Sequence, residues 1–171
     1  LARLGWVKIA KPGGCAIGDR PIDLHLRNLE RLGAVIEERH GYITARCLRL
    51  TGQEISLDFP SVGATENLMM AASLAKGKTI IYNAAREPEI VDIQNFLNQM
   101  GAKVYGAGTS VIVVEGIDAD HLGSTEYTVI PDRIEAGTYL LAAAVTRGSI
   151  TLENVIPQHI QALLSKLVET N

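Results

Sequence analysis

The chain has 171 residues, of which 47% are hydrophobic and 20% are charged, a balance typical of a folded globular protein and not of a disordered tail. The 16 basic and 19 acidic residues leave a formal net charge of −3, and only 5% of the residues are aromatic. The slight acidity argues against bulk binding to nucleic-acid phosphates, and the scarcity of aromatic rings argues against base stacking. No apolar run reaches the length of about 18 residues that a transmembrane helix needs, so we expect neither nucleic acid nor membrane as a partner.

Helices and short strands alternate in the predicted secondary structure. Ile22, Leu26 and Leu29 recur at helical spacing and predict a first helix over residues 21–32, which Gly33 ends. Further patterns predict, in chain order, strands over 34–36, 42–47 and 54–58, a helix over 65–75, a strand over 78–82, a helix over 89–100, strands over 103–105, 111–115 and 127–130, a helix over 134–146 and a strand over 149–153. Such alternation indicates sheets covered by helices, an α/β architecture with α+β layers.

An internal repeat organises these elements. Residues 29–36 resemble residues 97–104, and the small-residue helix that ends at Lys76-Gly77 resembles the one that ends at Arg147-Gly148, with a spacing of about 70 residues in each case. A third copy begins at Gln158. Units of this length and number do not fit a solenoid, so the repeat predicts a duplicated folding unit.

A glycine-rich loop, residues 11–20, runs into the first predicted helix and contains Cys15. Its glycines let backbone amides face a ligand, while the helix N-terminus and Arg20 favour an anion. One interpretation is a reactive Cys15, because Lys11, Arg20 and the amides would activate its thiol. The other is a plain turn around an inert, buried cysteine, and the loop by itself does not decide between the two.

A second polar cluster opens the helix predicted over residues 65–75. Ser61, Gly63 and Thr65 could offer hydroxyl and amide groups to a phosphate, or Ser61 or Thr65 could simply cap the helix. The corresponding place in the second repeat holds Asp132 and Arg133, which could contact a ligand or form a cap or a salt bridge.

The remaining titratable residues carry weaker signals. Glu87 and Glu89 could act as acid and base, although carboxylates before a helix more often favour its dipole. His25 lies on the first helix, where a solvated or core-edge histidine is expected, and no His/Cys spacing resembles a metal site. Cys47 lies in an alternating strand and looks like a packing residue; with two cysteines no disulfide framework is expected, so the predicted compartment is a reducing cytoplasm.

Four motifs in this order resemble those of the UDP-N-acetylglucosamine enolpyruvyl transferases (1-carboxyvinyltransferases), within the EPSP synthase family. They are Gly-Gly-Cys-Ala-Ile-Gly-x-Arg-Pro-Ile-Asp-Leu-His, Pro-Ser-Val-Gly-Ala-Thr-Glu-Asn, Asn-Ala-Ala-Arg-Glu-Pro-Glu-Ile-Val-Asp and Ile-Pro-Asp-Arg-Ile-Glu-Ala-Gly-Thr. The resemblance runs along the whole chain and implies repeated βαβαββ-type units of the enolpyruvyl transferase fold, an inside-out α/β barrel. It also implies that residues 1–130 form most of the domain with the catalytic loop and that residues 131–171 begin a second, incomplete domain.

The resemblance also implies a reaction. The enzymes transfer the enolpyruvyl group of phosphoenolpyruvate to the 3′-hydroxyl of UDP-N-acetylglucosamine and release phosphate, which is the first committed step of bacterial peptidoglycan synthesis. No metal and no cofactor are implied. The family's catalytic cysteine, the target of fosfomycin, matches Cys15. Residues implied to bind substrate are Arg20, Pro21, Ile22, Asp23, Leu24, Ser61, Val62 and Gly63; further candidates lining the cleft are His25, Glu87, Glu89, Asp132 and Arg133.

The chain also departs from the family pattern. Family members are more than twice as long, and some carry a lysine where this chain has Phe59. With no initiator Met and part of the cleft missing, the chain looks like an internal fragment that is inactive alone and prone to self-association. Two alternatives remain: the shikimate-pathway enolpyruvyl transferase, against which Cys15 and the Pro-Ser-Val-Gly-Ala-Thr motif argue, and a non-catalytic module of the same fold.

Overall fold

The computed structural model describes residues 1–14, 16, 18 and 21–170. The chain divides into two compact units, Leu1–Tyr127 and Thr128–Asn171. Within the described residues, no helix combines the length and the apolar character that crossing a bilayer requires.

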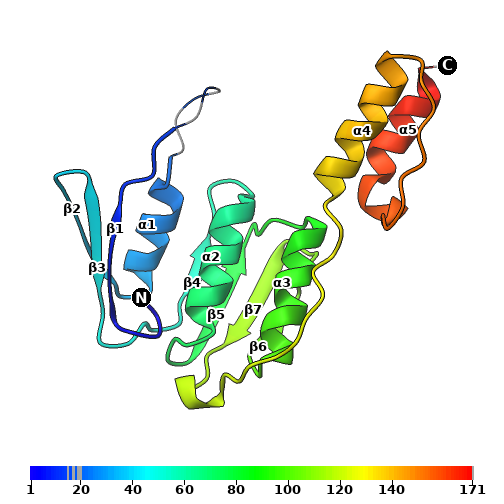
Figure 1. Ribbon diagram of the computed structural model, residues 1–171. Helices are drawn as coiled ribbons and strands as arrows, with labels where there is room; N and C mark the ends of the chain where they lie inside the picture. Colours follow the sequence, from blue (N-terminus) through cyan, green and yellow to red (C-terminus); the bar gives the residue numbers. More distant parts are fainter. Residues whose placement is uncertain (15, 17, 19–20, 171) are drawn as a thin grey trace. The chain divides into compact units, whose positions relative to one another are not determined.

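In its described residues, the first unit contains two sheets and three α-helices (Figure 1). Its elements in chain order are β1 (Trp6–Ala10), α1 (Asp23–Arg31), β2 (Val35–Arg39), β3 (Tyr42–Arg46), β4 (Glu54–Ser56), α2 (Val62–Ala72), β5 (Lys78–Tyr82), α3 (Pro88–Gln99), β6 (Lys103–Tyr105), β7 (Val111–Glu115) and the 3₁₀ turn Ala119–His121.

The two sheets are built on one plan. The 4-stranded sheet has the order β4-β5-β7-β6, with β4 parallel to β5 and with β7 antiparallel to both β5 and β6. With α2 and α3 it forms a βαβαββ unit. The 3-stranded sheet has the order β1-β3-β2, so β1, α1, β2 and β3 repeat the arrangement of β5, α3, β6 and β7. The predicted α/β class and the βαβαββ-type repeat are confirmed.

The repeat extends to the way in which α1 and α3 end. Gly33 and Gly101 follow these helices with φ angles of 97° and 106°, a backbone conformation that favours glycine. In both copies the amide after the glycine donates to the carbonyl of a leucine in the last helical turn: Ala34 to Leu29 at 3.1 Å and Ala102 to Leu97 at 3.0 Å. The sequence signal that revealed the repeat is therefore a helix-termination motif.

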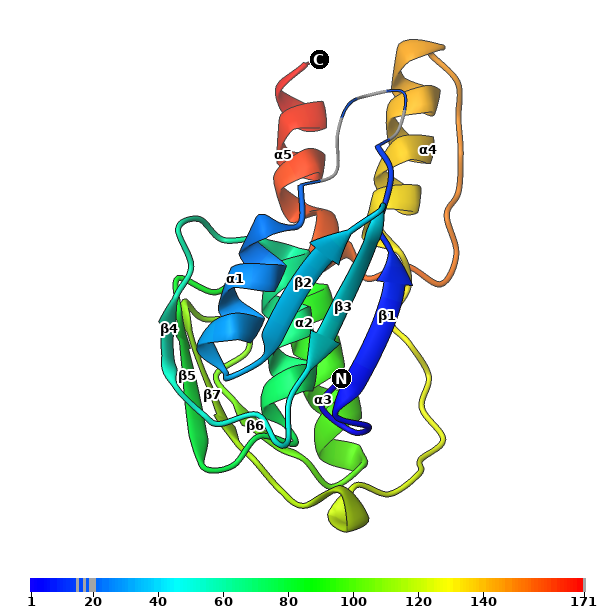
Figure 2. The same ribbon diagram turned by 90° about the vertical axis from the view of Figure 1, so that its left-hand side faces the viewer.

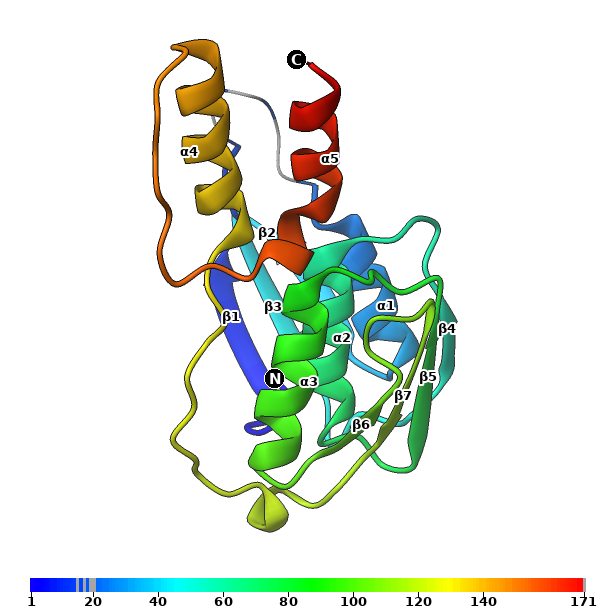
Figure 3. The same cartoon turned by 90° about the vertical axis from the view of Figure 1, so that its right-hand side faces the viewer.

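Figures 2 and 3 show the three helices side by side in one layer, with the sheets packed against them. The central helix, α2, is the most apolar of the three and contacts both of its neighbours. Its buried face includes Ala64, Ala71 and Ala72, whose small side chains let the neighbouring elements approach closely. The first unit has a continuous apolar core, whose largest fully buried members are Leu32, Leu50, Ile55, Leu57, Leu68, Met69, Ile81, Ile90, Val104, Ile112 and Val114.

The second unit consists of α4 (Arg133–Val145), the 3₁₀ turn Pro157–Ile160 and α5 (Gln161–Glu169), joined by an extended loop. The helices α4 and α5 lie side by side (Figures 1 and 3). Gly137 of α4 permits this, because a Cβ atom there would lie 3.0 Å from Cδ2 of Leu163.

The structure differs from the sequence-based prediction in several places. Strand β1 was not expected, and α2 begins at Val62 and ends at Ala72, three residues before the predicted bounds at each end. Residues 127–130 and 149–153 form no strand, because none of the described strands pairs with them. Tyr127 is instead held on α3: its hydroxyl donates to the Asp92 carboxylate at 2.7 Å, and its ring lies 5.3 Å from that of Phe96.

Candidate functional site

The catalytic candidate Cys15 and the substrate-binding candidate Arg20 lie outside the described residues. The flanking parts of the loop line an open pocket of about 460 Å³ between β1, β2 and the start of α1. Lys11 and Glu38 form an ion pair of 2.8 Å at this pocket. Gly14 and Pro21, which precede and follow the part of the sequence that contains Cys15 and Arg20, both line it.

The residues predicted to hold the sugar nucleotide at the start of α1 divide into two groups. Pro21, Ile22 and Asp23 line the pocket. The side chain of Leu24 is only 5% exposed and belongs to the apolar core. The apolar side chain of Leu24 therefore serves packing.

The N-terminus of α2 carries the second predicted cluster. Ser61 is the N-cap, and its hydroxyl oxygen accepts a hydrogen bond of 3.3 Å from the Ala64 amide. This confirms the capping interpretation and still leaves the hydroxyl proton free to be donated. The amides of Val62 and Gly63 have no hydrogen-bond acceptor within the described part of the chain, as expected for the first turn of a helix.

The electrostatics of this helix end favour an anion. The helices α1, α3 and α4 each carry an acidic residue in the first turn, namely Asp23, Glu89 and Glu135, whereas α2 carries none. The partial positive charge of the α2 N-terminus is therefore not offset by a carboxylate in its own first turn. Phosphate groups are suited to such a position.

His25 connects the start of α1 with the first turn of α2. Its ring packs against Gly63: a Cβ atom on Gly63 would lie 3.3 Å from Cε1 and 3.6 Å from Nε2 of His25. Nδ1 of His25 lies 3.0 Å from Nδ2 of Asn67. Partial burial lowers the pKa of His25, and the nearby Asp23 carboxylate raises it by a smaller amount. The ring is therefore a neutral group beside the helix end.

The acidic candidates Glu87 and Glu89 lie at the start of α3, and a buried hydrogen bond connects that region to α2. The Ala85 amide donates to Oγ1 of Thr65 at 3.1 Å, and Thr65 Oγ1 in turn donates to the Ser61 carbonyl at 2.7 Å. Glu87 is the N-cap residue of α3, and its carboxylate accepts from the Arg86 amide at 2.9 Å. Thr65 thus acts as a structural link, in addition to its place in the helix.

Glu66 is an acidic residue that the sequence did not single out. Burial raises its pKa, and the negative charge of Glu89 raises it further. The two carboxylates, from α2 and α3, therefore interact across the helix layer. The interaction makes the packing of these two helices less favourable while both carboxylates are ionised.

Asp132 and Arg133 belong to the second unit. Asp132 is the N-cap of α4, and its carboxylate accepts hydrogen bonds from the amides of Ile134, at 2.7 Å, and Glu135, at 3.1 Å. The capping alternative is confirmed for this residue. Asp132 also lines a pocket of about 350 Å³ between α4 and the loop that contains Leu152. Arg133 is the first residue of α4.

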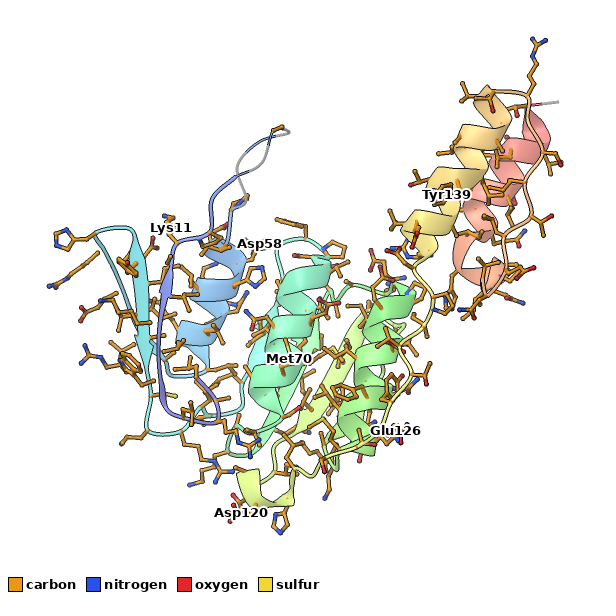
Figure 4. The ribbon with its side chains drawn as sticks, in the orientation of Figure 1. Lys11, Asp58, Met70, Asp120, Glu126 and Tyr139 are labelled. Carbon is orange, nitrogen blue, oxygen red and sulfur yellow. The ribbon has the colours of Figure 1, made fainter. Side chains whose placement is uncertain are left out.

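The sequence-based prediction missed two residues that link α1 to α2 or to the segment before it. Asn67 lies inside the second motif, but only the fold brings it to His25. Arg27 of α1 pairs with Asp58, the residue that precedes the α2 cap region. Figure 4 shows Lys11 and Asp58 at the same end of the first unit as the α2 N-terminus, so the ion pairs and the candidate anion site share one end of the helix layer.

The comparisons with known proteins agree with this geometry. Residues 1–170 match the family model of EPSP synthase (3-phosphoshikimate 1-carboxyvinyltransferase). A UDP-N-acetylglucosamine 1-carboxyvinyltransferase 1 from Symbiobacterium thermophilum is 65% identical over 99% of the chain, which covers 38% of that protein. One from Caldanaerobacter subterraneus subsp. tengcongensis is 60% identical over 99% of the chain, which covers 40% of that protein. The chain thus spans less than half the length of these curated relatives.

Solved structures share the fold at low sequence identity. The enolpyruvyl transferase NikO from Streptomyces tendae matches with a TM-score of 0.70 and 23% identity, over 83% of this chain and 34% of that one. An EPSP synthase from Acinetobacter baumannii matches with a TM-score of 0.60 and 22% identity, over 81% of this chain and 31% of that one. The βαβαββ units are therefore those of the enolpyruvyl transferase fold, and the chain belongs to the EPSP synthase family.

Proposed function

We propose that the whole protein to which this chain corresponds transfers the enolpyruvyl group of phosphoenolpyruvate to the 3′-hydroxyl of UDP-N-acetylglucosamine and releases phosphate. This would be the first committed step of peptidoglycan synthesis. The observation that carries the proposal is the α2 N-terminus, where a capped and acid-free first turn lies beside His25. The 65% identity to a relative named for this reaction supports it.

The substrate groups are assigned to the chain as follows. Pro21, Ile22 and Asp23 line the pocket that would hold the nucleoside end of the sugar nucleotide. The diphosphate would accept hydrogen bonds from the Ser61 hydroxyl and from the amides of Val62 and Gly63. Arg20 would contact the phosphate-bearing part of the site, and Glu87, Glu89, Asp132 and Arg133 would line or brace the cleft.

The chemical step needs one proton donor and a leaving phosphate. The 3′-oxygen attacks C2 of phosphoenolpyruvate while Cys15 delivers its proton to C3, which gives a tetrahedral intermediate. The bond from C2 to the phosphate oxygen then breaks, and the Cys15 thiolate takes a proton back from C3, so the double bond is restored in the product. The proton of the 3′-hydroxyl leaves with the released phosphate. Cys15 is the group suited to the first proton transfer, because a thiol can give up a proton near neutral pH.

Division of the site between two domains would make the isolated chain inactive. We assign residues 1–130 to the domain with the catalytic loop and residues 131–171 to the start of the second domain. A phosphate-release assay tests this: the 171-residue chain should release no phosphate from the two substrates, while the full-length protein should do so. Release by the chain alone at a normal enzymatic rate would contradict the assignment.

A cysteine-labelling experiment tests the function directly. Treatment with fosfomycin, followed by intact mass measurement and peptide mapping, should give an adduct on Cys15 that forms faster with UDP-N-acetylglucosamine present. Cys47 is the internal control, because its thiol is half-buried and burial raises its pKa. Iodoacetamide labelling of Cys15 without any fosfomycin adduct would mean that the chain does not assemble the anion site.

Binding tests can distinguish two other functions from the proposed one. A shikimate-pathway enolpyruvyl transferase shares the fold, but the solved EPSP synthase is only 22% identical to this chain, against 60–65% for relatives named for the sugar nucleotide. A binding test with shikimate 3-phosphate in place of UDP-N-acetylglucosamine separates them. A non-catalytic module would bind neither compound.

The cellular setting follows from the proposed reaction. The enzyme would act in the cytoplasm in cell-wall biogenesis, and so in cell shape and division, with small molecules as its partners. For the isolated chain we propose self-association through the 3-stranded sheet, where Trp6 and Val35, both paired with Arg46, are more than half exposed on one face. Sedimentation of the chain at increasing concentration tests this, and a monomer throughout would contradict it.

A further inference from the structure

The contact between His25 and Asn67 gives the candidate diphosphate site a defined hydrogen-bond donor. The side-chain nitrogen Nδ2 of Asn67 can only donate, and it lies 3.0 Å from Nδ1 of His25. Nδ1 must therefore be the acceptor. A neutral imidazole that accepts at Nδ1 carries its proton on Nε2.

The position of Nε2 would allow this proton to be donated to a ligand at the N-terminus of α2. Nε2 lies 3.6 Å from the place that a Cβ atom on Gly63 would occupy, and no described residue accepts a hydrogen bond from it. Nε2 is thus held beside the first-turn amides of α2. We propose that Asn67 is a positioning residue, which keeps His25 in the tautomer whose Nε2–H donates to a diphosphate oxygen bound at Ser61, Val62 and Gly63. This inference rests on the proposed function.

Asn67 can select the tautomer of His25 only because the imidazole is neutral. A protonated imidazole would donate from both nitrogens, and the tautomer would not matter. Partial burial lowers the pKa of His25, so at neutral pH the ring is uncharged and the position of its one proton decides whether Nε2 donates or accepts.

The internal repeat carries this pair in one copy only. The positions that correspond to His25 and Asn67 in the second copy are Ile93 and Thr138, which cannot form an imidazole–amide hydrogen bond. The helix ends, the strand order and the strand register recur in both copies without it. The pair is therefore a feature of the copy that carries the candidate anion site.

Two measurements on the full-length protein test the inference. The first is nitrogen-15 NMR of the histidine side chains at neutral pH, which reports the tautomer directly. His25 should be in the Nε2–H form in the wild type and should become a mixture of tautomers in Asn67→Leu. Asn67→Gln, which retains an amide donor, should keep the Nε2–H form. A wild-type His25 with its proton on Nδ1 would overturn the inference.

The second measurement is the affinity for uridine diphosphate, by calorimetry, in a double-mutant cycle. Asn67→Leu should weaken binding about threefold to tenfold, the effect of one neutral hydrogen bond. His25→Ala should weaken it by a similar factor, and the double variant should bind no more weakly than His25→Ala. Additive losses would mean that Asn67 does not act through His25 and would overturn the inference.

The controls separate this inference from the proposed function. Asn95→Leu makes the same change at an exposed position of α3 and should leave both the tautomer and the affinity unchanged. If the wild type fails to bind uridine diphosphate and UDP-N-acetylglucosamine, the proposed function fails. If the wild type binds and the Asn67 variants bind equally well, only the positioning role fails.

Discussion

Gly63 lies in the first turn of α2, directly beside the imidazole of His25. A Cβ atom at this position would approach Cε1 of His25 to 3.3 Å, which is closer than ordinary van der Waals contact. The ring would have to move by a few tenths of an ångström, against the hydrogen bond that Asn67 makes to it. Glycine at this position therefore leaves room for the histidine.

Gly63→Ala should weaken the binding of uridine diphosphate by the full-length protein about threefold, the effect of disturbing one hydrogen bond, while its melting temperature stays nearly constant. The higher helix propensity of alanine offsets the loss of stability that the crowding causes. It does not restore the position of the His25 ring. Calorimetry and thermal unfolding provide the two readouts. Gly123→Ala, at a position outside the helices where a Cβ atom would lie 3.7 Å from the Met100 carbonyl oxygen, is a control for the same change away from the site. Unchanged binding in Gly63→Ala would contradict the expected crowding.

Tyr127 shows how one hydrogen bond sets a pH dependence. Donation to the Asp92 carboxylate raises the pKa of Tyr127 to about 12, because the phenolate would lose this bond and face a negative charge. The native state thus holds the proton more tightly than the unfolded chain does. The resulting stability is fully present below the ordinary tyrosine pKa, near 10, and is lost as the pH rises toward 12.

Tyr127→Phe should destabilise the chain by about 1 kcal/mol at pH 8, the usual net value of a hydrogen bond. The difference from the wild type should shrink between about pH 10 and pH 12, as the Tyr127 contribution is lost. Urea unfolding at several pH values measures this. A difference that does not change over this range would mean that the Asp92 contact is absent in solution.

At the scale of single elements, the side chain of Asp132 decides where α4 begins. It accepts from two amides of the first turn, Ile134 and Glu135, which otherwise have no partner in the helix. Asp132→Ala should cost about 1 kcal/mol of stability, and Asp132→Ser, which can still cap, should cost less than half of that. Chemical unfolding of the three proteins checks the order. Equal losses in both variants would show that capping is not the cause.

The packing of α2 against α3 brings the carboxylates of Glu66 and Glu89 into interaction. Because burial and the charge of Glu89 raise the pKa of Glu66, ionisation of Glu66 disfavours the native state. Glu66→Gln should therefore stabilise the chain at pH 7, by about 0.5 kcal/mol if the pair resembles like charges on a helix surface. The gain should vanish as the pH falls below the range in which Glu66 ionises. Thermal unfolding at pH 7 and pH 4 tests this, and a destabilised variant at pH 7 would contradict it.

At the scale of the whole molecule, the chain contains two units joined by an extended segment. Residues 123–132 form no helix or strand, and Val129 is 71% exposed. Limited proteolysis with a protease of broad specificity should cut this segment first and leave a resistant product that ends near Tyr127. Mass measurement of the product identifies the site. Initial cleavage within α2, most of whose residues are buried, would contradict the division into units.

Several features of the fold and the site could be predicted from the sequence. Strands β5, β6 and β7 lie at the predicted residues, because each is a short run of apolar and β-branched residues with clear ends. The helix ends at Gly33 and Gly101 and the functional alternatives at Ser61 were also visible in the sequence. The predictions for Cys15 and Arg20 fall outside the described residues.

The failures that concern strands have one physical cause, which is that a strand exists only through its partner. Residues 6–10 have little alternation of burial, and β1 forms because β3 lies beside it in antiparallel register. Residues 127–130 and 149–153 have strand-like sequences, but no described strand offers them a ladder of hydrogen bonds. Backbone pairing depends on distant residues, which local patterns do not report.

The sequence by itself determined the repeat, the helix ends at Gly33 and Gly101 and the motifs that identify the family, because these depend on residue types at short spacing. The tertiary structure decided which side chains meet. Packing of α1 against α2 places His25 on Gly63 and within hydrogen-bond distance of Asn67, and it buries Leu24 in the core instead of exposing it to a ligand. These contacts join residues from different helices, so only the packing of those helices could establish them.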